Sequence, residues 1–330
     1  MRWLAGIFAV AVALWCGYWF AGSSAIERGL HSAMAQAEAG GRTARARELR
    51  VQGFPNRFDL VVEGLELADP VRGLGWQAPQ VQVFAMTWKP WHVIAALPVS
   101  QVITLPGQAI VLTGQDQMAS LRAAPSTDLP LAEARLVGRA QRAVSHAGWS
   151  VGLDTLAVAL RASPAEPAAY QFGLEATGIA PDPALTAALA PTDLPALADL
   201  LRIDLSLTLT APLDRHAGET RPALAALRIN EAQLIWGALK TDASGTVEPD
   251  AQGFAAGRVE IRLQGWDRLP PLLVAAGVLR ADLAPTVLNV LNAAAAGKEE
   301  LVLPLVLKDG QMGLGPLPLG PAPRFTAPSG

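Results

Sequence analysis

The sequence is almost devoid of cysteine. Its single cysteine, Cys16, lies inside an apolar stretch near the start of the 330-residue chain. A lone cysteine excludes an intramolecular disulfide framework and a thiolate zinc site. A lipid-modified Cys16 is also excluded, because the residue before such a cysteine is small and Trp15 is not. The fold must therefore rest on packing and hydrogen bonding alone.

An excess of charge of one sign is absent as well. The formal net charge is −3, and lysine occurs only at positions 89, 240, 298 and 308. Nucleic acid binding needs clustered cations, so this composition predicts no nucleic acid partner. The one cationic cluster comprises Arg42, Arg45, Arg47 and Arg50. A solvated face explains it, and a contact with anionic headgroups is the alternative.

Metal-binding and catalytic motifs are missing too. The four histidines are His31, His92, His146 and His216, and none has the spacing of a metal ligand pair. There is no nucleophile elbow, no Ser-x-x-Lys and no glycine-rich phosphate loop with lysine. We therefore expect no catalytic residue, no cofactor-binding residue, no metal ligand and no cofactor, and we predict that the protein is not an enzyme.

Several carboxylates lie near the ends of expected strands. They are Asp204, Asp242, Asp267 and Asp309. Solvated turn residues usually occupy such positions. A glycosidase needs only that two carboxyl groups meet in space, so a hydrolase built from such a pair is a minor hypothesis that the sequence leaves open.

One long apolar run stands against these absences. Residues Trp3–Phe20 hold 18 positions without a charge. A helix of that length covers about 27 Å, enough to cross the hydrocarbon core of a bilayer. Trp3 stands at one end and Trp15, Tyr18 and Trp19 at the other, and these residue types favour the headgroup level. The run predicts a transmembrane anchor over residues 1–22.

A cleaved secretory signal is the alternative interpretation of this run. Arg2 gives a positive start, and residues 21–25 are small. The apolar run is longer than a usual signal core, which favours the anchor. In both cases the rest of the chain is exported. We therefore predict a single-pass protein of a bacterial inner membrane, with its body in the periplasm.

The residues after the anchor predict an α+β chain dominated by antiparallel, curved sheets. Apolar spacings of three and four indicate a helical connector over 23–41. Strands are expected over 47–53, 58–67, 80–88, 94–105, 108–113, 132–140, 149–162, 168–178, 202–211, 224–236, 238–248, 254–266, 301–307 and 312–314. Helical segments are expected over 115–122, 183–201 and 267–296.

The pattern of side chains within these strands bears on function. Residues 202–211 alternate strictly between apolar and polar, which is typical of a half-buried strand. Residues 80–88 and 301–307 are apolar on both sides. Such strands are either covered by a second layer or present one face as a groove for an apolar ligand.

The body, residues 42–320, shows a weak internal similarity. A strand–turn–strand theme ends in Trp88-Lys89 and again in Trp266-Asp267. This indicates two related halves, 42–180 and 202–320. The proline-rich end of the chain, from residue 316, is expected to fray, with 321–330 as a flexible tail.

Several motifs resemble a known family. The segments Gly53–Asp59 (GFPNRFD), Gly75–Pro79 (GWQAP) and Lys89-Pro90, then Gly265–Asp267 and Leu307–Gly310, are similar to an uncharacterised bacterial envelope family, the "domain of unknown function 2125" family. The similarity covers most of residues 1–320. These motifs are turns and strand ends, and the family carries no assigned catalytic residues, so the resemblance implies no site residue. By architecture alone the chain also looks like the AsmA-type envelope proteins, which are associated with lipid movement or outer-membrane biogenesis.

Two functional hypotheses follow. In the first, an anchored periplasmic β-scaffold binds or handles lipid or another apolar ligand in envelope maintenance. In the second, a non-catalytic structural or interaction protein of the envelope has fully packed sheets and docks a protein partner by its exposed edges. The state of the sheet face, open or filled, separates the two.

Overall fold

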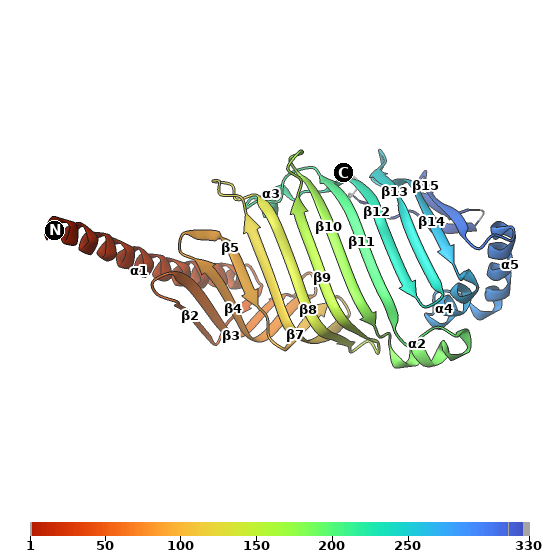
Figure 1. The fold of residues 1–330 in the computed structure, drawn as a ribbon, viewed down its shortest axis with the longest axis horizontal. Coiled ribbons are helices and arrows are strands. Elements are labelled where there is room, and N and C mark those ends of the chain that lie inside the picture. Colours follow the sequence, from red (N-terminus) through yellow and green to blue (C-terminus); the bar gives the residue numbers. More distant parts are fainter. Residues whose placement is uncertain (1, 316, 326–330) are drawn as a thin grey trace. The chain divides into compact units, whose positions relative to one another are not determined.

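The computed structural model describes residues 2–315 and 317–325 (Figure 1). It is 52% strand and 23% helix, and the strand pairs described below are antiparallel. The predicted fold class is therefore confirmed: a long apolar helix precedes a strand-dominated body with a few short helices.

Helix α1 (Arg2–Ala39) is one uninterrupted helix of 38 residues. It joins the predicted anchor and the predicted connector without a break. No proline lies within it, and Gly40-Gly41 end it, with Gly41 at φ 76°. Its length and composition suit a membrane span.

The chain divides into two compact units. Unit 1 is Met1–Pro125 with Leu136–Trp149, and unit 2 is Ser126–Arg135 with Ser150–Gly330. That the segments 42–180 and 202–320 are related halves stays a prediction.

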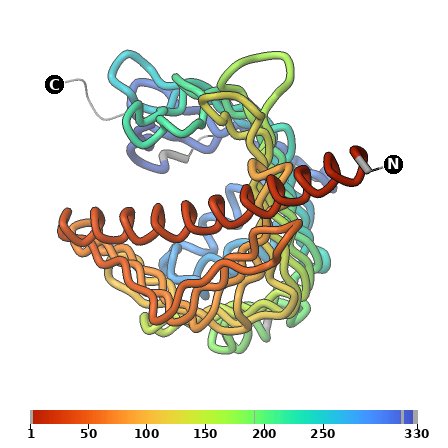
Figure 2. The backbone as a smooth tube through the Cα atoms, turned by 90° about the vertical axis from the view of Figure 1, so that its left-hand side faces the viewer, coloured from red at the N-terminus to blue at the C-terminus, as the bar shows by residue number. Residues whose placement is uncertain are grey.

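Unit 1 combines α1 with a sheet. Its strands are β1 (Thr43–Arg45), β2 (Glu48–Gln52), β3 (Arg57–Asp69), β4 (Leu74–Met86), β5 (Lys89–Ala96), β6 (Ser100–Leu105), β7 (Gln108–Ala123) and the later part of β8 (Leu131–Ser145). Strand β3 pairs with β1, β2 and β4, while β5 and β6 both lie between β4 and β7. Figure 2 shows α1 beside these strands.

Two predictions in unit 1 are wrong. The expected strand 94–105 is divided into β5 and β6, because Pro98 has no N–H to donate to a ladder. The expected helical turn 115–122 is instead the second half of the strand β7. Its pairing with β5, where Ala119 lies opposite Ala95, outweighs the helix propensity of the segment.

Unit 2 is an antiparallel meander in which each strand pairs with the next. The strands are β9 (Ser150–Ala162), β10 (Ala169–Ile179), β11 (Ala198–Leu209), β12 (Leu224–Trp236), β13 (Leu239–Pro249), β14 (Ala255–Gln264), β15 (Leu301–Lys308), β16 (Gln311–Leu314) and β17 (Leu317–Pro321). The helical segments are α2 (Pro183–Ala188), η1 (Ala190–Thr192), α3 (Ala217–Thr220), η2 (Trp266–Arg268), α4 (Leu269–Ala275), η3 (Ala281–Leu283) and α5 (Ala284–Ala295).

The helical predictions in unit 2 are correct in kind but too long. Helix formation over 183–201 ends at Thr192, and residues 198–201 already belong to β11. The helical pair within 267–296 consists of α4 and α5, separated by a turn at Gly277 with φ 70°.

The predicted fraying from residue 316 is wrong for 317–325. There β17 pairs with β16, and Ala255 N donates to Pro323 O. Residue 316 and residues 326–330 lie outside the described part of the chain.

The core of unit 2 lies on one face of its sheet. One cluster, around Val247, Val259 and Leu307, includes Ala322 from the end of the chain. A second lies beneath α5 and includes Leu263, Leu291, Leu301 and Leu303. A third joins α2 to the ends of β11 and β12 through Leu189, Ala198 and Trp236. The end of the chain, α5 and α2 therefore cover parts of this face of the sheet.

Candidate functional site

The register of strands β9, β10 and β11 gathers apolar side chains on one face of the sheet. Phe172 lies opposite Leu160 on one side and Leu205 on the other. Leu174 likewise lies between Val158 and Ile203. Directly opposed residues of an antiparallel pair point to the same side of the sheet. We call the surface formed by Val158, Leu160, Phe172, Leu174, Ile203, Leu205 and Leu207 the apolar patch.

The side chains of the apolar patch are only half-buried. The neighbouring positions at the edges of the same face are different. Tyr170 is 3% exposed, and its hydroxyl oxygen accepts a hydrogen bond of 2.7 Å from Leu213 N in the loop after β11. Leu301 is 1% exposed beneath α5. The covering elements thus leave the middle of β9–β11 open.

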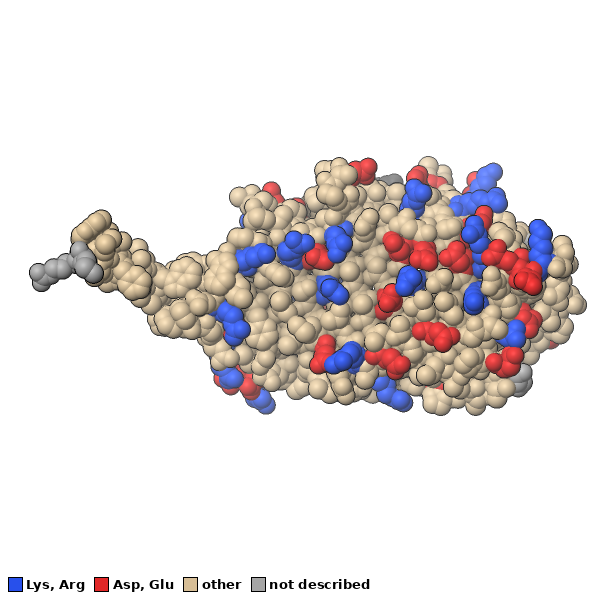
Figure 3. Space-filling view, in the orientation of Figure 1, with Lys and Arg blue, Asp and Glu red and all other residues tan. Residues whose placement is uncertain are grey.

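The opposite face of unit 2 is charged (Figure 3). Its groups are largely paired with one another, for example Arg202 with Glu175 at 3.0 Å and Arg262 with Glu260 at 2.9 Å. Asn230 donates to Asp204 at 2.9 Å. Two shallow depressions lie here, of about 690 and 390 Å³. Because these charges pair with one another, within β14 and between β10 and β11, we interpret this face as a solvated surface.

The two faces lie on opposite sides of a bend. Figure 2 shows the strands of unit 2 bent along their length, with the charged face of Figure 3 on the outside of the bend. The apolar patch therefore lies on the concave side. A concave apolar surface with few polar groups is the general form of a site for apolar ligands.

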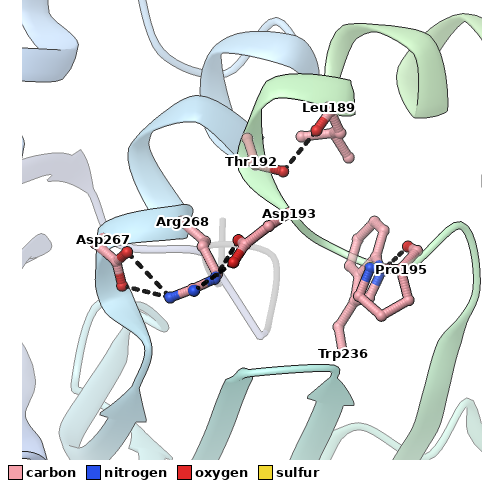
Figure 4. Close-up of polar contacts among 7 residues, drawn as sticks. All are labelled: Leu189, Thr192, Asp193, Pro195, Trp236, Asp267 and Arg268. Carbon is pink, nitrogen blue, oxygen red and sulfur yellow. Dashed lines mark hydrogen bonds and ion pairs between the residues drawn. The ribbon is translucent and has the colours of Figure 1, made fainter.

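At one end of this face the α2–η1 segment packs on the sheet, where Leu189 contacts Ala198 and Trp236. Figure 4 shows the polar contacts that hold this segment. Trp236 Nε1 donates to Pro195 O at 2.7 Å, and Thr192 Oγ1 donates to Leu189 O at 2.7 Å. Arg268 binds Asp193 through two hydrogen bonds, of 2.8 and 2.9 Å. The segment is thereby fixed to both β12 and the turn before α4.

Two carboxyl groups in this closing segment have perturbed pKa values. The hydrogen bond from Arg268 lowers the pKa of Asp193, and Asp193 in turn raises the pKa of Arg268. The backbone N–H of Ala184 lowers the pKa of Asp182, which caps α2 and also accepts from Ser150. Both aspartates are thus ionised structural anchors in this segment.

Unit 1 contains an open apolar pocket of about 460 Å³. Its walls come from the end of α1 and from β3, β4 and β6, with Ala37, Leu67, Trp76 and Ile103 among the lining residues. The rim carries Arg42 and Arg72. The indole N–H of Trp76 is not free to bind a ligand there, because Nε1 donates to Gln101 Oε1 at 2.7 Å.

The end of the apolar run of α1 is bound to the body of unit 1. Trp15 Nε1 donates to Pro55 O at 3.1 Å, Tyr18 OH to Thr87 O at 2.8 Å and Trp19 Nε1 to Arg57 O at 2.7 Å. The ring of Trp19 also stacks on Phe58, with centroids 6.2 Å apart. The motif Gly53–Asp59 therefore forms the surface on which the helix packs, which we call the seat of α1.

The histidines and carboxylates named from the sequence do not converge. Asp204 and Asp242 lie on the charged face with β12 between them, which separates the strands by about 10 Å. Asp267 pairs with Arg268, and Asp309 sits in the turn between β15 and β16. Within the described ranges no group of three His, Cys, Asp or Glu side chains could hold a metal ion.

For residues 301–307 the first of the two alternatives holds, because α5 covers one face of β15 as a second layer. In β15 the residues Leu301, Leu303 and Leu307 are buried, while Val302 on the other face is 46% exposed. The open patch lies instead on β9–β11. Its signal was visible in the sequence, since three strands in succession carry large apolar residues at every second position. Only the register shows that these positions coincide.

Neither a search of curated proteins nor a search of solved structures returns a significant match. The bacterial family described as "Uncharacterized protein conserved in bacteria (DUF2125)" matches residues 19–323. This range includes the seat of α1 and all the strands described above. The chain therefore belongs to this bacterial family.

Proposed function

We propose that this protein is held in the bacterial inner membrane by α1 and that its periplasmic β-rich body binds lipid or another apolar ligand on the apolar patch. The observation that carries the proposal is the half-buried state of seven large apolar side chains on the concave face of unit 2. Contiguous apolar surface of this kind usually marks an interaction site.

The chemistry of the patch favours acyl chains. Its side chains are aliphatic apart from Phe172, so they offer no hydrogen bonds to a polar ligand. A sugar or nucleotide would lose its hydration there without compensation. Each buried methylene of an acyl chain gains about 0.8 kcal/mol, and strands of this length can accommodate many of them.

The contacts of α1 support a retained anchor over a cleaved signal. Cleavage among the small residues 21–25 would fall inside a continuous helix. It would also remove Trp19, which is 7% exposed, and its hydrogen bond to Arg57 O. A signal that leaves after export has no reason to pack on the mature body.

Retention of the anchor is tested by intact mass measurement of the protein extracted from membranes. We expect the mass of the chain with its apolar run, and resistance of the protein to extraction by alkaline carbonate. A mature form that begins near residue 22–26 would contradict the anchor but not the ligand site.

Ligand binding is tested by lipid analysis of the full chain purified in several detergents. The variants Leu174→Gln and Leu205→Gln place an amide in the patch, at a cost of about 1–3 kcal/mol to a bound apolar chain. We expect about tenfold less copurified lipid, since 1.4 kcal/mol corresponds to a factor of ten. Ser206→Gln, which changes the opposite face of the same strand, serves as the control.

Equal lipid in wild type, patch variants and control would contradict the proposal. The alternative is an interaction protein of the envelope with fully packed sheets, which docks a protein partner by its exposed edges. In that case chemical crosslinking in cells would join an edge of the sheet to a polypeptide, and the lipid content would not depend on Leu174 or Leu205.

A further inference from the structure

Two turns lie together at one end of the strands of unit 1. One connects β2 to β3 and contains Phe54-Pro55; the other connects β4 to β5 and contains Thr87-Trp88. Thr87 joins them, because its N–H and its Oγ1 both donate to Asn56 O, each at 3.1 Å. Thr87 itself is 2% exposed. We call residues 53–57 and 86–89 the aromatic tip.

The outer side of the aromatic tip is apolar. Phe54 is 50% exposed, Met86 43% and Trp88 57%. Large apolar groups of this kind are expensive to leave in water, at about 25 cal/mol per Å² of apolar surface. The adjacent Lys89 is an exposed cation, whereas the exposed Arg57 pairs with Asp59 at 2.6 Å. The tip therefore combines aromatic rings with positive charge in a short span.

Helix α1 sets the position of the tip along its own axis. The three hydrogen bonds from Trp15, Tyr18 and Trp19 all end on backbone carbonyls of the tip. Phe20 stacks on Phe54 with centroids 5.6 Å apart. The tip thus lies beside the last residues of the apolar run and not beside the polar half of the helix.

This position coincides with the surface of the membrane that α1 spans. From Trp3, the hydrocarbon core of about 30 Å corresponds to about 20 residues of helix, so it ends close to Phe20. Trp15 lies five residues earlier, about 7.5 Å deeper along the helix. The carbonyls that bind Tyr18 and Trp19 then lie close to the headgroup level, while Pro55 O, which binds Trp15, lies nearer the hydrocarbon core.

We propose that the aromatic tip is a second membrane contact of the body, with Phe54 and Trp88 inserted at the headgroup level and Lys89 near the lipid phosphates. Aromatic rings favour this depth, and basic side chains are attracted by anionic lipid. The inference rests on the spanning role proposed for α1, but not on the apolar ligand. Together the helix and the tip fix the orientation of unit 1 on the bilayer.

The test uses the full chain in vesicles of phosphatidylethanolamine and phosphatidylglycerol. In a Cys16→Ser background, single cysteines replace Phe54 and Trp88 and carry an environment-sensitive fluorophore. Phe8→Cys reports on the spanning helix. Val71→Cys is the matched control, because Val71 is 95% exposed at the other end of β3, about 40 Å from the tip.

Lipids with a spin label near the headgroup are expected to quench most of the emission at positions 54 and 88 and none at position 71. Lipids labelled deep in the chain are expected to quench position 8. If position 8 is quenched but positions 54 and 88 are quenched no more than position 71, the proposed membrane contact of the tip is wrong and the spanning role of α1 still holds. An unquenched position 8 would overturn both.

Discussion

At the scale of single residues, the absence of a side chain at Gly22 decides how closely α1 approaches the sheet. A Cβ built at Gly22 would lie 2.6 Å from Cζ of Phe58, whose ring is 6% exposed. This is far inside van der Waals contact. Glycine therefore permits the helix to rest on the ring, at some cost in helix propensity.

Replacement of Gly22 by leucine is expected to push α1 away from β3. Overpacking of this kind costs about 1–3 kcal/mol. We expect a lower melting temperature and faster hydrogen exchange in residues 23–39. Gly29→Leu is the control, because nothing lies within 4 Å of a Cβ at Gly29. Equal effects of the two substitutions would show that Phe58 does not set the helix position.

Two aspartates confer a pH dependence on the segment that closes the concave face. Hydrogen bonds from Arg268 and from the N–H of Ala184 lower the pKa values of Asp193 and Asp182 in the folded chain. A lowered folded pKa means that the stabilisation is complete above the unfolded value of about 3.9. It is lost as the pH falls through the folded values, which lie below that.

The melting temperature of wild type is accordingly expected to exceed that of Asp193→Asn at pH 6, and the difference is expected to shrink as the pH falls below about 4. Calorimetry over that range measures it. Glu299→Gln, a change at an exposed acid, provides the comparison. A difference between wild type and Asp193→Asn that stays constant down to pH 3 would contradict the role given to the ion pair.

At the scale of elements, the sequence predicted strands well where one face is apolar. The alternation of 202–211 corresponds to β11, and 224–236 matches the bounds of β12. The errors occur where tertiary pairing outweighs local preference. Residues 115–122 have good helix formers but complete the long strand β7 against β5, which no local pattern shows.

The candidate site was less accessible to prediction than the strands. The sequence predicted β9, β10 and β11 as strands, but it showed strict alternation only in 202–211 and did not show which apolar positions share a face. Whether a given face is covered depends on α2, α5 and the end of the chain, which come from distant parts of the sequence. For residues 301–307 the sequence left a covering layer and an open groove as alternatives, and only the position of α5 decides between them.

Covered and open parts of the same sheet are expected to respond differently to truncation. Leu291 on α5 is 3% exposed, so Leu291→Ala is expected to cost about 2–5 kcal/mol of unfolding free energy. Leu205→Ala on the open patch leaves no enclosed cavity and is expected to cost less than about 1.5 kcal/mol. Chemical denaturation of both variants measures the difference, and equal losses would mean that the patch is packed like a core.

At the scale of the whole molecule, each unit has its own task in this account. Unit 1 carries the anchor and the aromatic tip, so it determines where the protein lies. Unit 2 carries the apolar patch on a concave face and a network of paired charges on the convex face. The family match over residues 19–323 covers most of each unit.

The most direct test of this account is site-specific photocrosslinking in living bacterial cells. A photoreactive amino acid replaces Leu205 in the apolar patch and, separately, Ser206 on the charged face of the same strand. The account predicts adducts with lipid at position 205 and none at position 206. Lipid adducts absent from position 205, or equally abundant at both positions, would contradict it.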